Sequence, residues 1–78
     1  MAATLRSVMI VGCENQAQAE LAVQTLEAKT YFAREGTFRA EDGGGGRWYV
    51  YLDTHRARGP SRDWNTAARW YVYGATGR

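Results

Sequence analysis

The sequence predicts an α+β fold in which one long and one short helix pack on one face of a small antiparallel sheet. Three observations support this prediction: an apolar run near the N-terminus, a segment with helical spacing after it, and the pentapeptide Arg-Trp-Tyr-Val-Tyr, present at 47–51 and again at 69–73. We expect a ferredoxin-like β-α-β-β-α-β order with three to four strands; the alternative order is β-α-β-β-α. The 78 residues suffice for one modest core, so we expect a single domain over 1–78.

The N-terminal third predicts a strand followed by a helix. Residues 5–11 form a mainly apolar run that is rich in β-branched side chains and ends before Gly12, which predicts a strand. Because this run is apolar on both faces, we expect it at the centre of the sheet. Asn15 is a plausible N-cap, with Gln18 as a weak capping box, for a helix from Gln16 to about Lys29.

The middle of the chain predicts a hairpin. We favour a strand that begins near Tyr31, kinks at Gly36 and continues to Glu41; alternatively the helix runs on and Gly36 caps it. Residues 42–46, an aspartate and four glycines, predict a flexible hairpin loop. Residues 47–54 alternate apolar and polar and predict an antiparallel strand that pairs with the preceding one.

The C-terminal third allows two interpretations. Residues 55–60 form a basic loop, and Ser61 can cap a short helix over 62–68, which leaves 69–73 as a last strand. The alternative is one continuous helix that ends at Gly74, since its apolar residues also fit a period of 3.6. The β-branched and aromatic residues of 69–73 favour the strand.

The repeated pentapeptide supplies the main candidate site. In two extended copies the Trp and Val side chains point to one face of the sheet and the Tyr side chains to the other. Exposed tyrosines flanked by arginine offer stacking platforms for bases or anchors for a protein partner. The candidate binding residues on this face are Arg47, Tyr49, Tyr51, Arg69, Tyr71 and Tyr73. The alternatives are cross-strand tyrosine pairing for stability, dimerisation through the sheet, and a sheet turned so that the tryptophans lie outside.

The basic loop supplies a second candidate site. Arg56, Arg58 and Arg62 lie close in sequence to a predicted helix N-terminus, so they could bind phosphate; otherwise the segment is a solvated loop. The net charge is +2, with six basic against two acidic residues in 43–78, which suits an acidic protein surface or phosphate. His55 has no second His or Cys at ligand spacing, so we expect no metal site.

These patterns favour binding over catalysis, with no cofactor. We expect a non-enzymatic protein-binding module, an adaptor or inhibitor that docks on a larger protein or nucleoprotein complex, of the kind seen in phage-encoded inhibitors such as anti-CRISPR proteins. The alternative is single-stranded nucleic-acid binding through the same arginines and tyrosines. Residues 47–51 lack the glycines of the RNA-recognition motif. An enzyme centred on Cys13 with His55 as base ranks last, because nothing local brings the two together.

The single cysteine and the lack of a long apolar run indicate where in the cell the protein lies. Cys13 is the only cysteine, which excludes an intramolecular disulfide and gives no sign of an oxidising compartment. No apolar run approaches the ~18 residues of a membrane span. We therefore expect a cytoplasmic protein without membrane association, as a monomer or homodimer.

Overall fold

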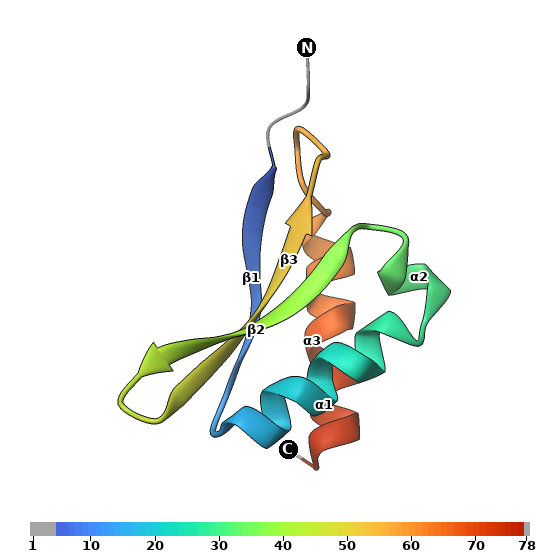
Figure 1. Cartoon of the computed structure of the whole chain (residues 1–78). Coiled ribbons are helices and arrows are strands. Elements are labelled where there is room, and N and C mark those ends of the chain that lie inside the picture. Colours follow the sequence, from blue (N-terminus) through green and yellow to red (C-terminus); the bar gives the residue numbers. More distant parts are fainter. Residues whose placement is uncertain (1–4, 78) are drawn as a thin grey trace.

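The computed structural model describes residues 5–77 and shows a three-stranded sheet with helices on one side of it (Figure 1). The elements in chain order are β1 (Arg6–Cys13), α1 (Gln16–Glu27), α2 (Thr30–Ala33), β2 (Thr37–Gly44), β3 (Arg47–Thr54) and α3 (Arg62–Thr76). All strand pairs are antiparallel, and the order across the sheet is β1-β3-β2. The predicted α+β class with a small antiparallel sheet is confirmed.

The predicted last strand is wrong, because residues 69–73 lie inside α3. Both ends of this helix are fixed by local capping. The Ser61 hydroxyl accepts a hydrogen bond from the Trp64 amide at 3.1 Å, and Gly77 ends the helix in the left-handed conformation at φ 80°. The observed order matches the alternative prediction, β-α-β-β-α, with the short helix α2 inserted between α1 and β2. The same pentapeptide is thus a strand between two β partners and a helix between two caps.

The segment after α1 also differs from the prediction. Residues from Tyr31 form the single turn α2 rather than a strand, and β2 begins only at Thr37. The turn buries Phe32, whose ring lies 5.6 Å from that of Trp64. A Cβ atom at Gly36 would clash with the Asp53 carbonyl oxygen, so the entry into β2 requires glycine.

The strand β1 lies at an edge of the sheet and not at its centre, which β3 occupies. Its apolar run is interrupted on one face, where Ser7 and Met9 are exposed. The register against β3 shifts between Met9 and Val11, and this β-bulge accompanies burial of both Ile10 and Val11. Nε of Arg69 donates to the Ile10 carbonyl at 3.3 Å, which ties α3 to the edge of β1.

The core lies between the sheet and the helices. Its β3 contribution is Val50 and Leu52, both fully buried, while α3 contributes Trp64, Ala68 and Val72 at helical spacing. The remaining buried apolar residues are Ile10, Val11, Cys13, Ala19, Ala22, Leu26, Phe32 and Phe38. Within residues 5–77, the opposite face of the sheet carries no helix (Figure 1).

Candidate binding surface

The face of the sheet that turns away from the helices is called the open sheet face here. Because alternate residues of a strand share a face, β3 presents Tyr49 and Tyr51 on this side, opposite to the buried Val50 and Leu52. The alternation predicted for the first pentapeptide is therefore confirmed. The open sheet face comprises Ser7, Met9 and Gly12 of β1, Thr37, Arg39 and Glu41 of β2, and Arg47, Tyr49, Tyr51 and Asp53 of β3.

A polar network joins all three strands at one end of this face. Asp53 accepts hydrogen bonds from the Ser7 hydroxyl at 2.6 Å and from Nε of Arg39 at 2.8 Å. The Ser7 hydrogen bond, followed by that of Arg39, lowers the pKa of the Asp53 carboxyl from its ordinary value of 3.8. Arg39 also pairs with Glu41 at 3.0 Å, and its guanidinium lies 4.8 Å from the centre of the Tyr51 ring. Both carboxylates of this face are thus already paired.

Tyr49 lies between two glycines at the other end of the face. A Cβ atom at Gly12 would come within 3.5 Å of its ring, and one at Gly43 would overlap the ring. The ring therefore occupies the space that a side chain at Gly43 would fill, whereas a Cβ at Gly12 would make an ordinary van der Waals contact with it. Tyr49 is half-buried, and its cross-strand partners are Gly12 of β1 and Glu41 of β2.

The second pentapeptide does not join this face, so the prediction of four tyrosines on one side of the sheet is wrong. Successive helical residues are turned by about 100°, which sends Tyr71 and Tyr73 in different directions. Tyr71 packs on Phe32 at 5.3 Å and beneath Nζ of Lys29 at 5.7 Å. Trp70 is 65% exposed, whereas the strand interpretation predicted that it is buried.

Trp70 belongs to an exposed stripe along α3. Its ring meets that of Tyr73 edge to face, with centroids 5.4 Å apart and planes at 89°. Helical spacing places further residues on the same side, and the α3 stripe comprises Arg62, Thr66, Arg69, Trp70 and Tyr73. It is opposite to the side that buries Trp64, Ala68 and Val72.

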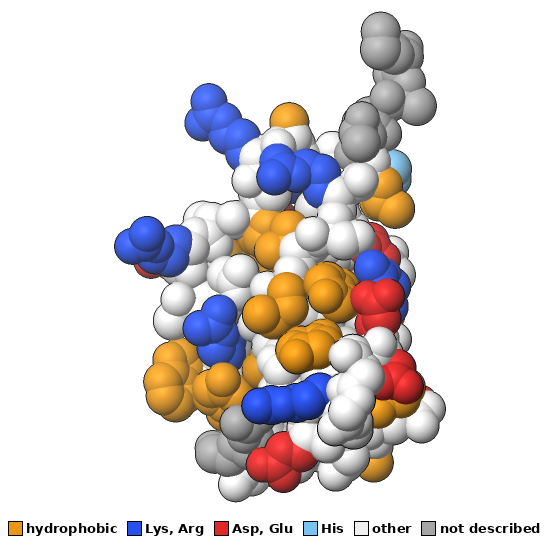
Figure 2. Space-filling model, turned by 90° about the vertical axis from the view of Figure 1, so that its left-hand side faces the viewer, with side chains coloured by type: hydrophobic (Ala, Val, Ile, Leu, Met, Phe, Trp, Pro, Cys, Tyr) orange, Lys and Arg blue, Asp and Glu red, His pale blue; other side chains and the backbone are white. Residues whose placement is uncertain are grey.

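Arg69 brings the α3 stripe to the edge of the open sheet face. It bonds the carbonyl of Ile10, whose neighbour Met9 lies on the open sheet face and is 46% exposed. Figure 2 views the molecule from the sheet side and shows hydrophobic side chains in the middle and at the lower left, with basic side chains above and to the left and acidic side chains along the right and at the bottom. We call Met9, Tyr49, Tyr51, Trp70 and Tyr73 together the aromatic surface.

The arginines of the basic loop do not converge. Arg56 turns to Glu35, with Nη1 at 3.3 Å from Oε1 and 3.1 Å from Oε2. Arg58 is exposed in the loop, whereas Arg62 is the first residue of α3 and belongs to the α3 stripe. The three charges therefore do not form one phosphate site.

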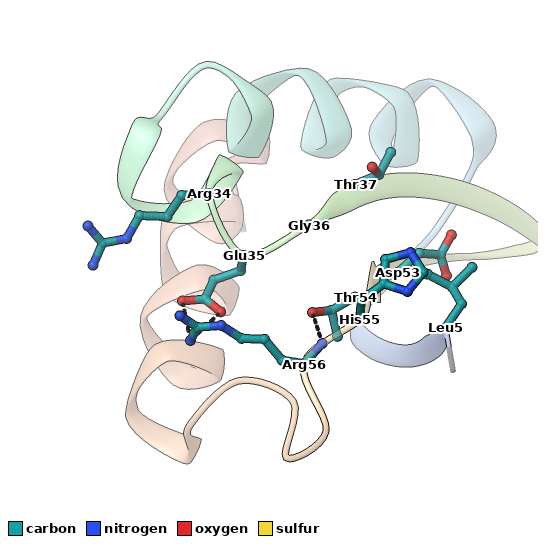
Figure 3. Close-up of a pocket in the computed structure, with 9 residues that line it drawn as sticks. All are labelled: Leu5, Arg34, Glu35, Gly36, Thr37, Asp53, Thr54, His55 and Arg56. Carbon is teal, nitrogen blue, oxygen red and sulfur yellow. Dashed lines mark hydrogen bonds and ion pairs between the residues drawn. The ribbon is translucent and has the colours of Figure 1, made fainter. Parts of the chain in front are cut away.

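A depression of about 650 Å³ lies between the α2–β2 turn and the end of β3 (Figure 3). Its lining residues are Leu5, Arg34, Glu35, Gly36, Thr37, Asp53, Thr54, His55 and Arg56. The Glu35 side chain is only 9% exposed and its charge is paired with Arg56, while Thr54 accepts the Arg56 amide at 3.1 Å. Arg34 points away from this pair in Figure 3. The charged groups at this end of the depression are thus paired with each other and do not converge on an open centre, although Oε2 of Glu35 accepts no hydrogen bond from the described residues.

Cys13 and His55 lie at opposite ends of the sheet. Cys13 pairs with Trp48 at one end of the β1–β3 ladder, and His55 follows Thr54, which pairs with Arg6 at the other end. Seven residues of strand separate these ends by about 23 Å. Cys13 is also 2% exposed, so the two side chains do not form a catalytic dyad.

Among residues 5–77, no group of three or more His, Cys, Asp or Glu side chains is arranged to hold a metal ion. No helix within the same range is long and apolar enough to cross a membrane.

Comparison with protein-family models, with curated proteins and with solved structures gives no match to this chain. The geometry of the aromatic surface therefore carries the functional argument.

The exposed Trp70 is the feature that the strand interpretation missed. A signal for it was present in the sequence: Ser61 as N-cap and Trp64 and Ala68 at helical spacing favour a helix that continues through the second pentapeptide. In that helix Trp70 lies away from the side of Trp64 and Ala68.

Proposed function

We propose that this protein is a small non-enzymatic binding module, an adaptor or inhibitor, that docks on a larger protein or nucleoprotein complex through the aromatic surface. The exposure of Trp70 carries the proposal. A tryptophan that is 65% exposed leaves a large apolar area in water, and its edge-to-face contact with Tyr73 holds it in place. Exposed apolar patches of this kind mark interaction sites, and tryptophan and tyrosine are the residues most enriched among binding hot spots.

The surroundings of Trp70 support a protein partner. Aromatic centres with arginine nearby match the composition of protein interfaces. Met9 and Tyr51 are partners in the β1–β3 ladder, and the polar network around Asp53 fixes Arg39 over Tyr51. Side chains fixed before binding lose little entropy when a partner docks. The small size of the chain fits an inhibitor or adaptor such as those encoded by phages, including anti-CRISPR proteins.

The test is capture of a partner from the source cell by tagged protein, with Trp70→Ala compared with Tyr31→Ala. Tyr31 is a matched control, since it is 51% exposed on α2 and lies outside the aromatic surface. We expect Trp70→Ala to lose the captured protein and Tyr31→Ala to retain it. Equal capture by both variants contradicts the proposal, provided that both have the circular dichroism of the wild type.

Single-stranded nucleic-acid binding is the second candidate, and the setting of Tyr49 favours it. Glycines flank its ring at 12 and 43, and Arg47 lies two residues before it on the same face of β3, so a base that stacks on Tyr49 would have a cation nearby. Binding of this kind weakens steeply as salt rises, because counterions are released from the phosphates. Titration of an oligothymidine at low and high salt tests it, and absence of binding at low salt rejects it.

A further inference from the structure

Three arginines beside the aromatic surface lack a carboxylate partner within the described residues 5–77, whereas Arg39 beside Tyr51 is paired. The arginines that form ion pairs within the described residues are Arg39 and Arg56. No described carboxylate pairs with Arg47, Arg62 or Arg69. Arg47 starts β3 on the open sheet face, and the other two lie on the α3 stripe.

The charges on the two sides of the molecule are therefore unequal. On the side of β2, Glu41 and Asp53 are both paired with Arg39, and the hydrogen bonds from Ser7 and Arg39 lower the pKa of Asp53. On the side of α3, Asp63 is the one carboxylate of the helix, and it stands next to Arg62 rather than on the α3 stripe. The α3 stripe is cationic around the exposed Trp70 and the half-buried Tyr73.

From this asymmetry we propose that the partner presents an acidic protein segment, with an apolar side chain that meets Trp70 and Tyr73 and carboxylates that meet Arg62 and Arg69. This inference rests on the proposed function and adds the chemistry of the partner. Arg62 and Tyr73 are eleven positions apart, about 16 Å along the helix. A short acidic segment spans that length. Arginine suits it, since its planar guanidinium binds carboxylates through two hydrogen bonds.

Charge complementarity also predicts how binding depends on conditions. Contacts at the border of an interface act mainly on the association rate and weaken with added salt. The apolar contact at Trp70 weakens little with salt, because it depends on buried area. Binding therefore has a salt-sensitive part from the arginines and a salt-resistant part from the aromatic pair.

The test uses two synthetic 12-residue peptides of alternating Leu and Glu or alternating Leu and Gln, and oligothymidine of 12 nucleotides as the nucleic-acid probe. Binding to the full chain is followed by anisotropy of a dye on each probe. We expect the Glu peptide to bind about tenfold more tightly than the Gln peptide at low salt, because several arginines gain partners. Equal affinity for both peptides, or no binding by either, overturns the inference.

Two charge reversals locate the contact. Arg62→Glu is expected to weaken the Glu peptide about fivefold to tenfold, and a glutamate in the first turn of α3 favours the helix dipole, so folding is preserved. Arg58→Glu makes the same change of net charge in the exposed loop and is expected to leave the affinity within about twofold. Equal loss in the two variants overturns the inference, since net charge alone then explains binding.

The remaining outcomes separate this inference from the proposed function. If Trp70→Ala loses the cellular partner while the two peptides bind alike, the proposed docking function is retained and the inference of an acidic partner is rejected. If oligothymidine binds, depends on Trp70 and Arg62, and the peptides do not bind, single-stranded nucleic acid replaces the protein partner and both proposals fail.

Discussion

Nε of Arg39 on β2 lies 2.8 Å from Oδ2 of Asp53 on β3, and the Ser7 hydroxyl of β1 bonds the other carboxylate oxygen of Asp53 at 2.6 Å. These two contacts join all three strands on the face that no helix covers. Since Asp53 is the shared acceptor, its ionisation state controls the whole network.

The lowered pKa of Asp53 predicts a loss of stability in acid. A carboxyl whose pKa is lower in the folded than in the unfolded state stabilises the fold fully above its ordinary value of 3.8. That contribution disappears as the pH falls through the lower folded-state value. Urea unfolding between pH 7 and pH 2 measures it. We expect Asp53→Asn to be less stable at pH 7 and to show a shallower fall in acid, whereas Glu41→Gln keeps most of the fall. The same acid slope in wild type and Asp53→Asn contradicts this role.

The two tryptophans of α3 should respond oppositely to truncation. Trp64 is 4% exposed and its ring stacks on Phe38 at 6.2 Å, so Trp64→Ala removes core contacts and should cost about 3–5 kcal/mol. Trp70→Ala, at a residue that is 65% exposed, should change the free energy of unfolding by less than about 1 kcal/mol. Chemical denaturation of both variants decides. A large loss at Trp70 would show a structural rather than a binding residue.

Two glycines should respond oppositely to alanine. Gly74 lies in α3 with nothing within 4 Å of an added Cβ, so Gly74→Ala should stabilise by about 0.5–1 kcal/mol through helix propensity. At Gly36 the added atom clashes with the Asp53 carbonyl, so Gly36→Ala should destabilise. Thermal unfolding by circular dichroism compares them. Stabilisation at both positions contradicts the described turn into β2.

The hairpin glycine beneath Tyr49 predicts a local effect on the open sheet face. A Cβ at Gly43 overlaps the Tyr49 ring, so Gly43→Ala must displace that ring. The φ of Gly43 is not left-handed, so steric overlap rather than backbone strain causes the change. Gly45→Ala is the comparison for a loop glycine, since its Cβ meets nothing within 4 Å although its φ of 62° disfavours alanine. We expect the chemical shifts of the Tyr49 ring to change in Gly43→Ala and to stay at their wild-type values in Gly45→Ala. Unchanged resonances in Gly43→Ala contradict the close contact.

The elements with strong local signals could be predicted from the sequence. Asn15 caps α1 by accepting the Gln18 amide at 2.9 Å, as its position predicted, and the alternation of 47–54 sorts Tyr49 from Val50 correctly. The helix cap depends only on residues close in the chain, and the alternation depends only on the period of two in a strand, so both can be predicted from local sequence.

The rest depended on competition between local signals and on tertiary contacts. Residues 69–73 favour a strand by composition, but the Ser61 and Gly77 caps and the burial of Val72 favour a helix. The edge position of β1 follows from pairing with β3, and the Arg69 bond to Ile10 joins residues 59 positions apart. No local pattern specifies such a contact, so the α3 stripe could not be placed beside Met9 before the structure.

The central claim is that the aromatic surface is where a partner docks, and a nuclear magnetic resonance titration of the labelled protein with the Leu-Glu peptide tests it most directly. We expect the resonances of the Trp70 indole, the Tyr73 ring and the Met9 methyl to shift in proportion to the peptide added, while those of Tyr31 and Leu21 stay in place. Shifts confined to α1, α2 or the loop 55–60, with Trp70 unmoved, would contradict it.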